Sequence, residues 1–203
     1  MASRWSQLNE PWRVALEQAI AAYLRQNSAP IGAAIIDGRS EVVSRGANAF
    51  ASSRLAHAEL NALVALPSDT DRASCEIYST LEPCPMCAGA IRMSQLRGVH
   101  FAARDPSAGS TDLLSANEFM REFPCVVHRP EDADLEMVIV SLVLEFRLRT
   151  GHMRWLDHWR AYHPGGANCG LRLFESSAYP SWVEGSATAE SIYDQVVSMR
   201  EAA

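Results

Sequence analysis

The sequence predicts a layered α/β domain with mostly parallel strands, followed by an aromatic-rich C-terminal extension. Apolar runs of strand length alternate with amphipathic stretches of helix length along residues 10–150. The chain has 203 residues, of which 48% are hydrophobic and 21% charged, and this composition excludes a disordered chain. We therefore expect one domain over residues 1–150 and an extension over residues 151–203 that packs on it and could close over an active site.

The first elements are a helix and a hairpin. Apolar residues at helical spacing predict a helix over 12–25, and the Ala29-Pro30 step ends it. The short apolar run 31–37 suits a buried strand. The Asp37-Gly38 turn then joins this strand to a hairpin partner over 41–46.

The rest of the domain alternates helices with short strands. Acidic residues open the last long helix and arginines close it, as the helix dipole favours. The expected elements are helices over 57–66, 83–95, 113–122 and 132–149, and strands over 75–80, 98–103 and 125–128. In the extension we expect one helix over 187–199 and a break in regular structure at Pro164-Gly165-Gly166. Trp155 and Trp159 are four residues apart, and we expect them to pack one helical face on the core.

Composition excludes several classes of protein. The longest apolar stretch, 137–144, is too short for a bilayer that requires about 20 residues, and the polar start of the chain has no signal-peptide core. Five cysteines with one tight pair indicate reduced thiols and a special site, so we expect a cytoplasmic protein. The net charge is −6, and all 18 basic residues are arginine. This balance makes a large polyanionic partner such as tRNA less favoured than a small molecule.

Two short motifs carry the chemistry. His57-Ala58-Glu59 opens one predicted helix, and Pro83-Cys84-Pro85-Met86-Cys87 opens another. Two cysteines three apart on a first helical turn can share one metal, and His57 can supply a third ligand. Three protein ligands with an open fourth position are typical of catalytic zinc. Glu59 lies about 200° around a helix from His57, so we expect it to act as a general acid/base rather than as a ligand.

Two alternatives compete with this interpretation. A Cys-x-x-Cys pair can be two buried thiols, or half of a structural zinc site closed by a fourth ligand. The candidate fourth ligands are Cys75, Cys125 and Cys169.

These motifs resemble the signature of the zinc-dependent cytidine deaminase-like superfamily. The segment Thr80–Ile91 is similar to the branch that contains guanine deaminases and bacterial tRNA adenosine deaminases, as are the segments 30–33, 102–105 and 108–110. The resemblance covers roughly residues 10–150. It implies a three-layer α/β/α fold whose five-stranded mixed sheet has its fifth strand parallel to the fourth.

The resemblance also implies roles for individual residues. His57, Cys84 and Cys87 would bind Zn²⁺, and Glu59 would move protons. Substrate contacts would come from Asn48, Ala58, Asp105 and Asp112, although Asp112 could instead cap the helix that starts at residue 113.

The implied reaction is hydrolytic deamination, in which an exocyclic amine becomes a carbonyl and ammonia leaves. The charge balance and the extension favour a small purine or pyrimidine base, nucleoside or related heterocycle, with a guanine-type purine first. The alternatives are a tRNA adenosine deaminase and a zinc-binding protein without turnover. The family resemblance further implies a homodimer.

Overall fold

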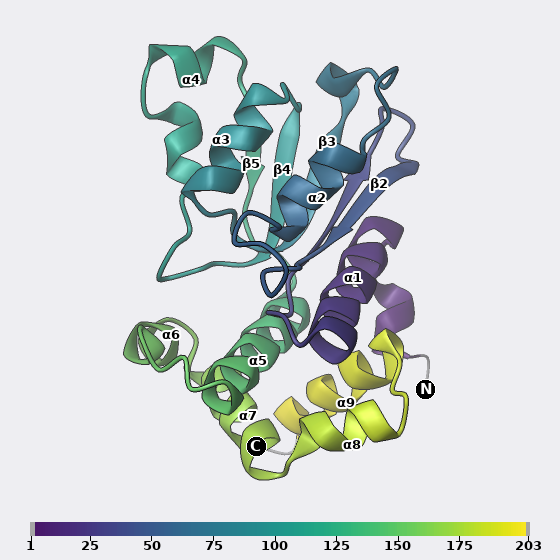
Figure 1. Ribbon diagram of the computed structural model, residues 1–203, viewed down its shortest axis with the longest axis vertical. Coiled ribbons are helices and arrows are strands. Elements are labelled where there is room, and N and C mark those ends of the chain that lie inside the picture. The colour runs from purple at the N-terminus through teal and green to yellow at the C-terminus, as the bar shows by residue number, and fades with distance from the viewer. Residues whose placement is uncertain (1–2, 202–203) are drawn as a thin grey trace.

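The computed structural model describes residues 3–201, in which one mixed sheet is flanked by helices (Figure 1). Within those residues the sheet has five strands in the order β2-β1-β3-β4-β5. The strands are β1 (Gly32–Ile36), β2 (Val42–Ala47), β3 (Glu76–Leu81), β4 (Gly98–Ala103) and β5 (Val126–His128). β1 runs antiparallel to β2 and β3, while β3, β4 and β5 are parallel. The expected parallel fifth strand is confirmed.

Two layers of helices cover the sheet. Helices α2 (Ala58–Ala65) and α3 (Pro85–Met93) lie on one face, and α1 (Glu10–Gln26) and α5 (Ala133–Arg149) lie on the other. Alternation along β1 shows this division, because Ala33 packs in the core under α2 whereas Ala34 packs against α1. None of the helices in the described part of the chain has both the length and the apolar character that a membrane span requires.

Local signals place the helix ends. The side chain of Asn9 caps α1 by accepting from the N–H of Trp12, and α1 ends at Asn27 in the left-handed region. Asp132 caps α5 by accepting from two backbone N–H groups, and arginines occupy the last turn as expected. The Asp37 carboxylate accepts from the N–H groups of Arg39 and Glu41, which closes the predicted hairpin turn.

The single helix expected over 113–122 is wrong. The chain forms a 3-10 turn, η3 (Thr111–Ser115), and then a separate short helix, α4 (Glu118–Glu122). Asn117 separates the two because its backbone is extended and its side chain caps α4 by accepting from the N–H of Met120. Two further 3-10 turns are η1 (Arg4–Gln7) and η2 (Arg72–Ser74).

The C-terminal extension is more helical than the sequence predicted. It contains α6 (Leu156–Tyr162), α7 (Pro164–Glu175), α8 (Ala178–Glu184) and α9 (Ala189–Glu201). Their apolar side chains share one core cluster with α1 and α5, and α9 corresponds to the one helix that was expected. In Figure 1 these helices lie around α5 and the lower end of α1, beyond the end of the sheet.

The expected break in regular structure at Pro164-Gly165-Gly166 is wrong, because Pro164 begins α7 and both glycines lie inside that helix. A Cβ on Gly166 would stand 2.8 Å from the Cβ of Val140, and one on Gly170 would stand 2.7 Å from the Cβ of Leu144. These two glycines therefore let α7 approach α5 closely. This packing explains why glycine lies inside a helix, where its low helix propensity alone would disfavour it.

The two tryptophans that were expected to share one packed helical face lie in different environments. Trp159 is fully buried in the core, as expected. Trp155 stands before α6 with a φ of 69°, and its side chain is 41% exposed. It therefore does not share the packed face of Trp159.

Candidate metal centre and catalytic site

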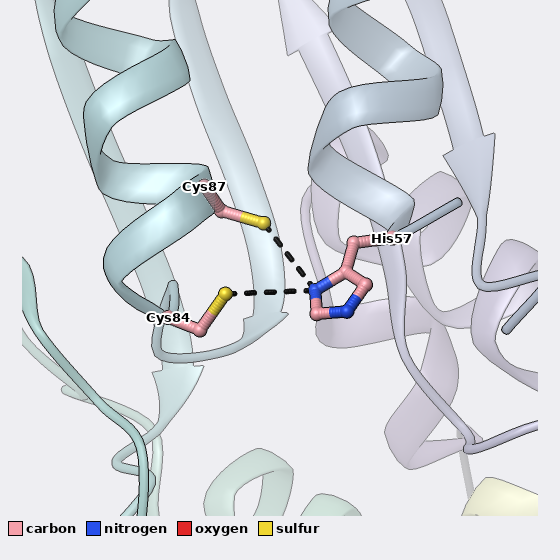
Figure 2. Close-up of side chains that lie close together, drawn as sticks. All are labelled: His57, Cys84 and Cys87. Atoms are coloured by element: carbon pink, nitrogen blue, oxygen red, sulfur yellow. Dashed lines mark hydrogen bonds between the residues drawn. The ribbon is translucent and has the colours of Figure 1, made fainter. Parts of the chain in front are cut away.

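Three ligating side chains converge where α2 and α3 begin (Figure 2). His57 is the N-cap of α2, Cys84 is the N-cap of α3, and Cys87 lies in the first turn of α3. The Nδ1 atom of His57 is 3.5 Å from each of the two Sγ atoms. All three ligand atoms lie within 4.8 Å of one another.

Close packing of α2 on the sheet sets the position of His57. A Cβ on Gly46 of β2 would stand only 2.2 Å from the carbonyl oxygen of Ala58 and 2.4 Å from the nitrogen of Ala62. The hydroxyl of Ser44, also on β2, donates to the carbonyl of Ala62 at 2.6 Å. The first turns of α2 are thus fixed to the backbone of β2, and His57 is carried with them.

The geometry and the chemistry of this donor set fit zinc. Zn–S bonds of about 2.3 Å and a Zn–N bond of about 2.0 Å at a tetrahedral angle would place sulfur and nitrogen about 3.5 Å apart. The observed 3.5 Å distances match this value without movement of the backbone. Two thiolates and one imidazole are ligands that zinc prefers, and they leave a fourth position open.

The pKa values of the two cysteines move apart. The interaction with Cys87 lowers the pKa of Cys84 to about 4, and the interaction with Cys84 raises that of Cys87. The imidazole of His57 also bonds to Cys84, and this contact raises the pKa of His57. One thiolate is therefore present at neutral pH, and a bound cation would displace the second proton.

The proposed fourth ligands lie elsewhere. Within residues 3–201, the cluster around His57 contains none of Cys75, Cys125 and Cys169. The Cys75 thiol lies 3.3 Å from the carbonyl of Asp71, and Cys169 lies beside Met199 in the other core. No disulfide joins the cysteines of the described chain. A closed four-ligand structural site has no support here.

Glu59 lies beside the metal ligands rather than among them. Glu59 is 4% exposed, and one of its carboxylate oxygens, Oε2, accepts from the thiol of Cys87 at 3.4 Å. The hydroxyl of Ser79 on β3 donates to the other oxygen, Oε1, at 3.1 Å. Burial raises the pKa of Glu59. A buried carboxylate with a raised pKa, held next to a metal position, is suited to proton transfer.

Asn48 is held in one orientation. Its Oδ1 atom accepts from the hydroxyl of Ser28 at 2.7 Å and from the N–H of Phe50 at 3.1 Å. Because the backbone N–H of Phe50 can only donate, that atom must be the oxygen. No hydrogen bond from the amide nitrogen of Asn48 is found among the described residues, so this nitrogen remains available as a donor.

The other expected substrate contacts differ in position. Ala58 is fully buried in the first turn of α2. Asp105 accepts from the backbone N–H groups of Ser107 and Ala108 and so closes its own loop. Asp112 is inside η3, whose N-cap is Ser110 without a side-chain capping bond, so its predicted role as a helix cap is wrong.

Several residues of this site were missed from the sequence. Ser28 and Ser79 come from segments with no motif, and only the fold brings them to Asn48 and Glu59. Phe50 lies two residues after Asn48, and the fold brings its ring to His57. The ring of Phe50 is 46% exposed, and its centroid is 6.3 Å from that of His57. For Phe50, the sequence signal that could have found it is an aromatic residue in the loop that leads to His57.

The buried carboxylate of Glu82 was missed as well. Its Oε1 atom accepts from both the N–H and the hydroxyl of Thr111. The N–H of Ser110 donates to the carbonyl of Pro83 at 3.0 Å. These bonds tie the loop after β4 to the segment that enters α3.

Comparison with known proteins agrees with this geometry. Residues 6–103 match the family described as the cytidine and deoxycytidylate deaminase zinc-binding region. A tRNA-specific adenosine deaminase of Rickettsia bellii is 34% identical over 125 residues, which are 59% of this chain and 83% of that protein.

Solved structures share the fold. A chain from a study of A-to-I editing by tRNA:A34 deaminases at the wobble position of transfer RNA is 27% identical, with a TM-score of 0.51, and the match covers 57% of this chain and 93% of that one. A guanine deaminase from Nitrosomonas europaea is 23% identical with a TM-score of 0.52, covering 70% of this chain and 86% of that one.

Proposed function

The chain belongs to the cytidine and deoxycytidylate deaminase zinc-binding family, and we propose that it hydrolyses the exocyclic amine of a small purine or related heterocycle. The observation that carries this proposal is the placement of the buried Glu59 carboxylate beside the His57-Cys84-Cys87 cluster. A purely structural metal site has no use for a proton acceptor in that place.

Each side chain has a role in this proposal. Zinc held by three protein ligands would lower the pKa of a water molecule to about 7. Glu59 is placed to accept a proton from the attacking water and to return it to the departing nitrogen, while Ser79 holds the other carboxylate oxygen. The water oxygen bonds to the ring carbon, the carbon–nitrogen bond breaks, and ammonia leaves.

Substrate binding is assigned to the residues around the metal. The amide nitrogen of Asn48 donates to an acceptor on the ring edge of the base, and Phe50 covers one side of the pocket. Ala58 lines the pocket at the start of α2. Asp105 and Asp112 act through the loop after β4, which Glu82 ties to α3.

The extension is proposed to limit access to this pocket. Arg147 of α5 interacts electrostatically with Asp105, and Tyr162 of α6 interacts with Arg104 and Glu82. Thus α6 and the end of α5 lie beside the loop that follows β4. A lid built from this side would suit a small ligand better than a folded RNA.

A tRNA adenosine deaminase is the second candidate, because the Rickettsia bellii relative is matched over most of its length. The net charge of −6 favours the small-molecule substrate. The two candidates differ in salt dependence, since RNA binding releases counterions and weakens steeply with salt.

We also propose that the chain is a cytoplasmic homodimer. Unpaired cysteines support the compartment. Exposed apolar side chains on α2, α3 and α4 support self-association through that face: Val64 is 86% exposed, Met93 66% and Phe119 54%.

The test is ammonia release from zinc-loaded protein. The panel contains bases, nucleosides, pterins, triazines and an adenosine-34 tRNA anticodon stem-loop. Glu59→Gln should keep one zinc per chain in this centre yet lower turnover by about 10²- to 10⁴-fold. Glu175→Gln, an exposed acid on α7, is the matched control. Full activity of Glu59→Gln would refute the assigned role. Turnover of the stem-loop alone would replace the first candidate by the second.

A further inference from the structure

A second group of ligating side chains lies on the other face of the sheet. Glu76, His100 and His128 come from the neighbouring strands β3, β4 and β5, and their ligand atoms all lie within 4.8 Å of one another. His100 is in register with His128, and Glu76 is two residues before the partner of His100 on β3. All three therefore point to the same side of the sheet.

That side is the α1 face. Ile77 and Val99 pack in the core under α2 and α3, so the residues that alternate with them face away from the zinc centre. Tyr78, which stacks on His100, contacts Trp12 of α1 with ring centroids 4.9 Å apart. The second cluster is thus separated from the His57 centre by the full thickness of the sheet.

The carboxylate of Glu76 is already oriented. Arg97 donates to its Oε1 atom from Nε at 3.0 Å, and the Nη2 atom of Arg97 lies 2.7 Å from the same oxygen. The other oxygen, Oε2, faces Nε2 of His100 at 2.8 Å. Arg97 thus balances the charge of the carboxylate and leaves Oε2 free to face His100. Hydrogen bonds of this kind, made by a residue outside the ligand set, orient metal ligands in proteins.

His100 and His128 open into a groove. They line a cavity of about 620 Å³ together with Trp12 and Glu131. Among the described residues, neither ring nitrogen of His128 has a hydrogen-bond partner, and the Glu131 carboxylate makes no hydrogen bond or ion pair. Within the described residues, two potential ligands therefore have no hydrogen-bond partner and lie beside a hydrogen-bonded Glu–His pair.

We propose that Glu76, His100 and His128 form a second site for a divalent transition metal, Zn²⁺ first, with open positions that face the groove and Glu131. Two imidazoles and one carboxylate are a donor set that zinc and related first-row metals take. The two rings stack with centroids 3.9 Å apart, so they must tilt toward one another for binding. Ligand atoms about 3.4 Å apart suit a tetrahedral site, so none of the distances has to close by more than about 1.5 Å.

The position of the site suggests what the metal does. β5 contains only Val126–His128 and, among the described strands, pairs with β4 alone, at the edge of the sheet. A metal that joins His128 to ligands on β3 and β4 would attach this short strand to the centre of the sheet. Binding would then add to the free energy of unfolding in proportion to metal occupancy.

Cobalt titration of protein already loaded with one zinc tests the proposal. We expect a second equivalent to bind with d–d absorption but without the sulfur-to-cobalt charge-transfer band that a Cys₂His centre gives. Native mass spectrometry should then count two metals per chain, and the midpoint of thermal unfolding should rise.

Variants assign the second equivalent to these residues. His128→Ala should weaken it by more than tenfold while the first zinc stays bound. Glu76→Gln keeps the shape of the side chain and should have the same effect if the histidine variant folds poorly. His152→Ala removes an exposed histidine outside the cluster and should change nothing. Absence of a second equivalent, or equal binding by both cluster variants and the wild type, would overturn the proposal.

Discussion

The close contact between Gly46 and α2 gives a sharp test of how the metal centre is positioned. An added Cβ at Gly46 would stand 2.2 Å from the carbonyl oxygen of Ala58, where ordinary contact begins at 3.4 Å. Helix and strand must therefore separate by about 1.2 Å. Overpacking of this kind costs about 1 to 3 kcal/mol. In a chain of this size, that loss lowers the midpoint of thermal unfolding by between about 2 and 12 °C.

The same displacement should reach the metal. His57 caps α2, whereas both cysteines belong to α3, so movement of α2 changes the distance between the ligands. Metal sites tolerate only about 0.2 Å of change in their bond lengths. We expect Gly46→Ala to bind zinc more weakly than the wild type, measured by competition with a chromophoric chelator.

Gly89→Ala is the matched control, because no atom of another element among residues 3–201 lies within 4 Å of the added Cβ on α3. Alanine favours the helix by about 1 kcal/mol, so unfolding should shift upward by about 2 to 4 °C with zinc affinity unchanged. If Gly46→Ala has the same unfolding midpoint and zinc affinity as the wild type, the contact with β2 does not set the position of His57 and the reasoning fails.

Two further predictions concern hydrogen bonds that only the fold reveals. Ser28→Ala should raise KM about 2- to 12-fold with little change in kcat, because Asn48 loses one of the two donors that fix its amide. Ser28→Thr keeps the hydroxyl and should restore KM. An unchanged KM of Ser28→Ala in steady-state kinetics would contradict this prediction. Burial first, and then the Glu145 carboxylate, raises the pKa of Tyr23 above its ordinary value of 10.0. The folded state therefore keeps a proton that the unfolded chain loses, and stability should fall as pH rises above about 10. Tyr23→Phe should flatten this alkaline slope in urea unfolding, and a slope equal to that of the wild type would show that Tyr23 is not its source.

Periodicity and turn signals predicted most of the deaminase domain. The Asp37-Gly38 hairpin, the strand–helix order and the caps of α5 depend on neighbouring residues, so they could be derived from the sequence. The helix over 113–122 failed because Asn117 can cap as well as continue a helix. Helix α7 was missed because Gly166 and Gly170, which lie inside it, are poor helix formers in isolation.

The candidate metal ligands were predictable for a related reason. Cys84 and Cys87 are three residues apart, and His57 belongs to a motif with Glu59, so spacing and residue type alone indicated a zinc centre with three protein ligands. The family of the chain follows from the same residues.

The sequence alone determined the chemistry of the site, through the motif residues proposed to bind zinc and move protons. The tertiary structure decided which other side chains surround those residues. Motif residues close in the chain share a helix turn, and that geometry is local. Ser28 with Asn48, Ser79 with Glu59, and His100 with His128 are contacts between separate elements. They depend on strand register and helix packing, which arise only when the whole chain buries its apolar surface. For this reason the substrate pocket and the second cluster could not be derived from the order of residues alone.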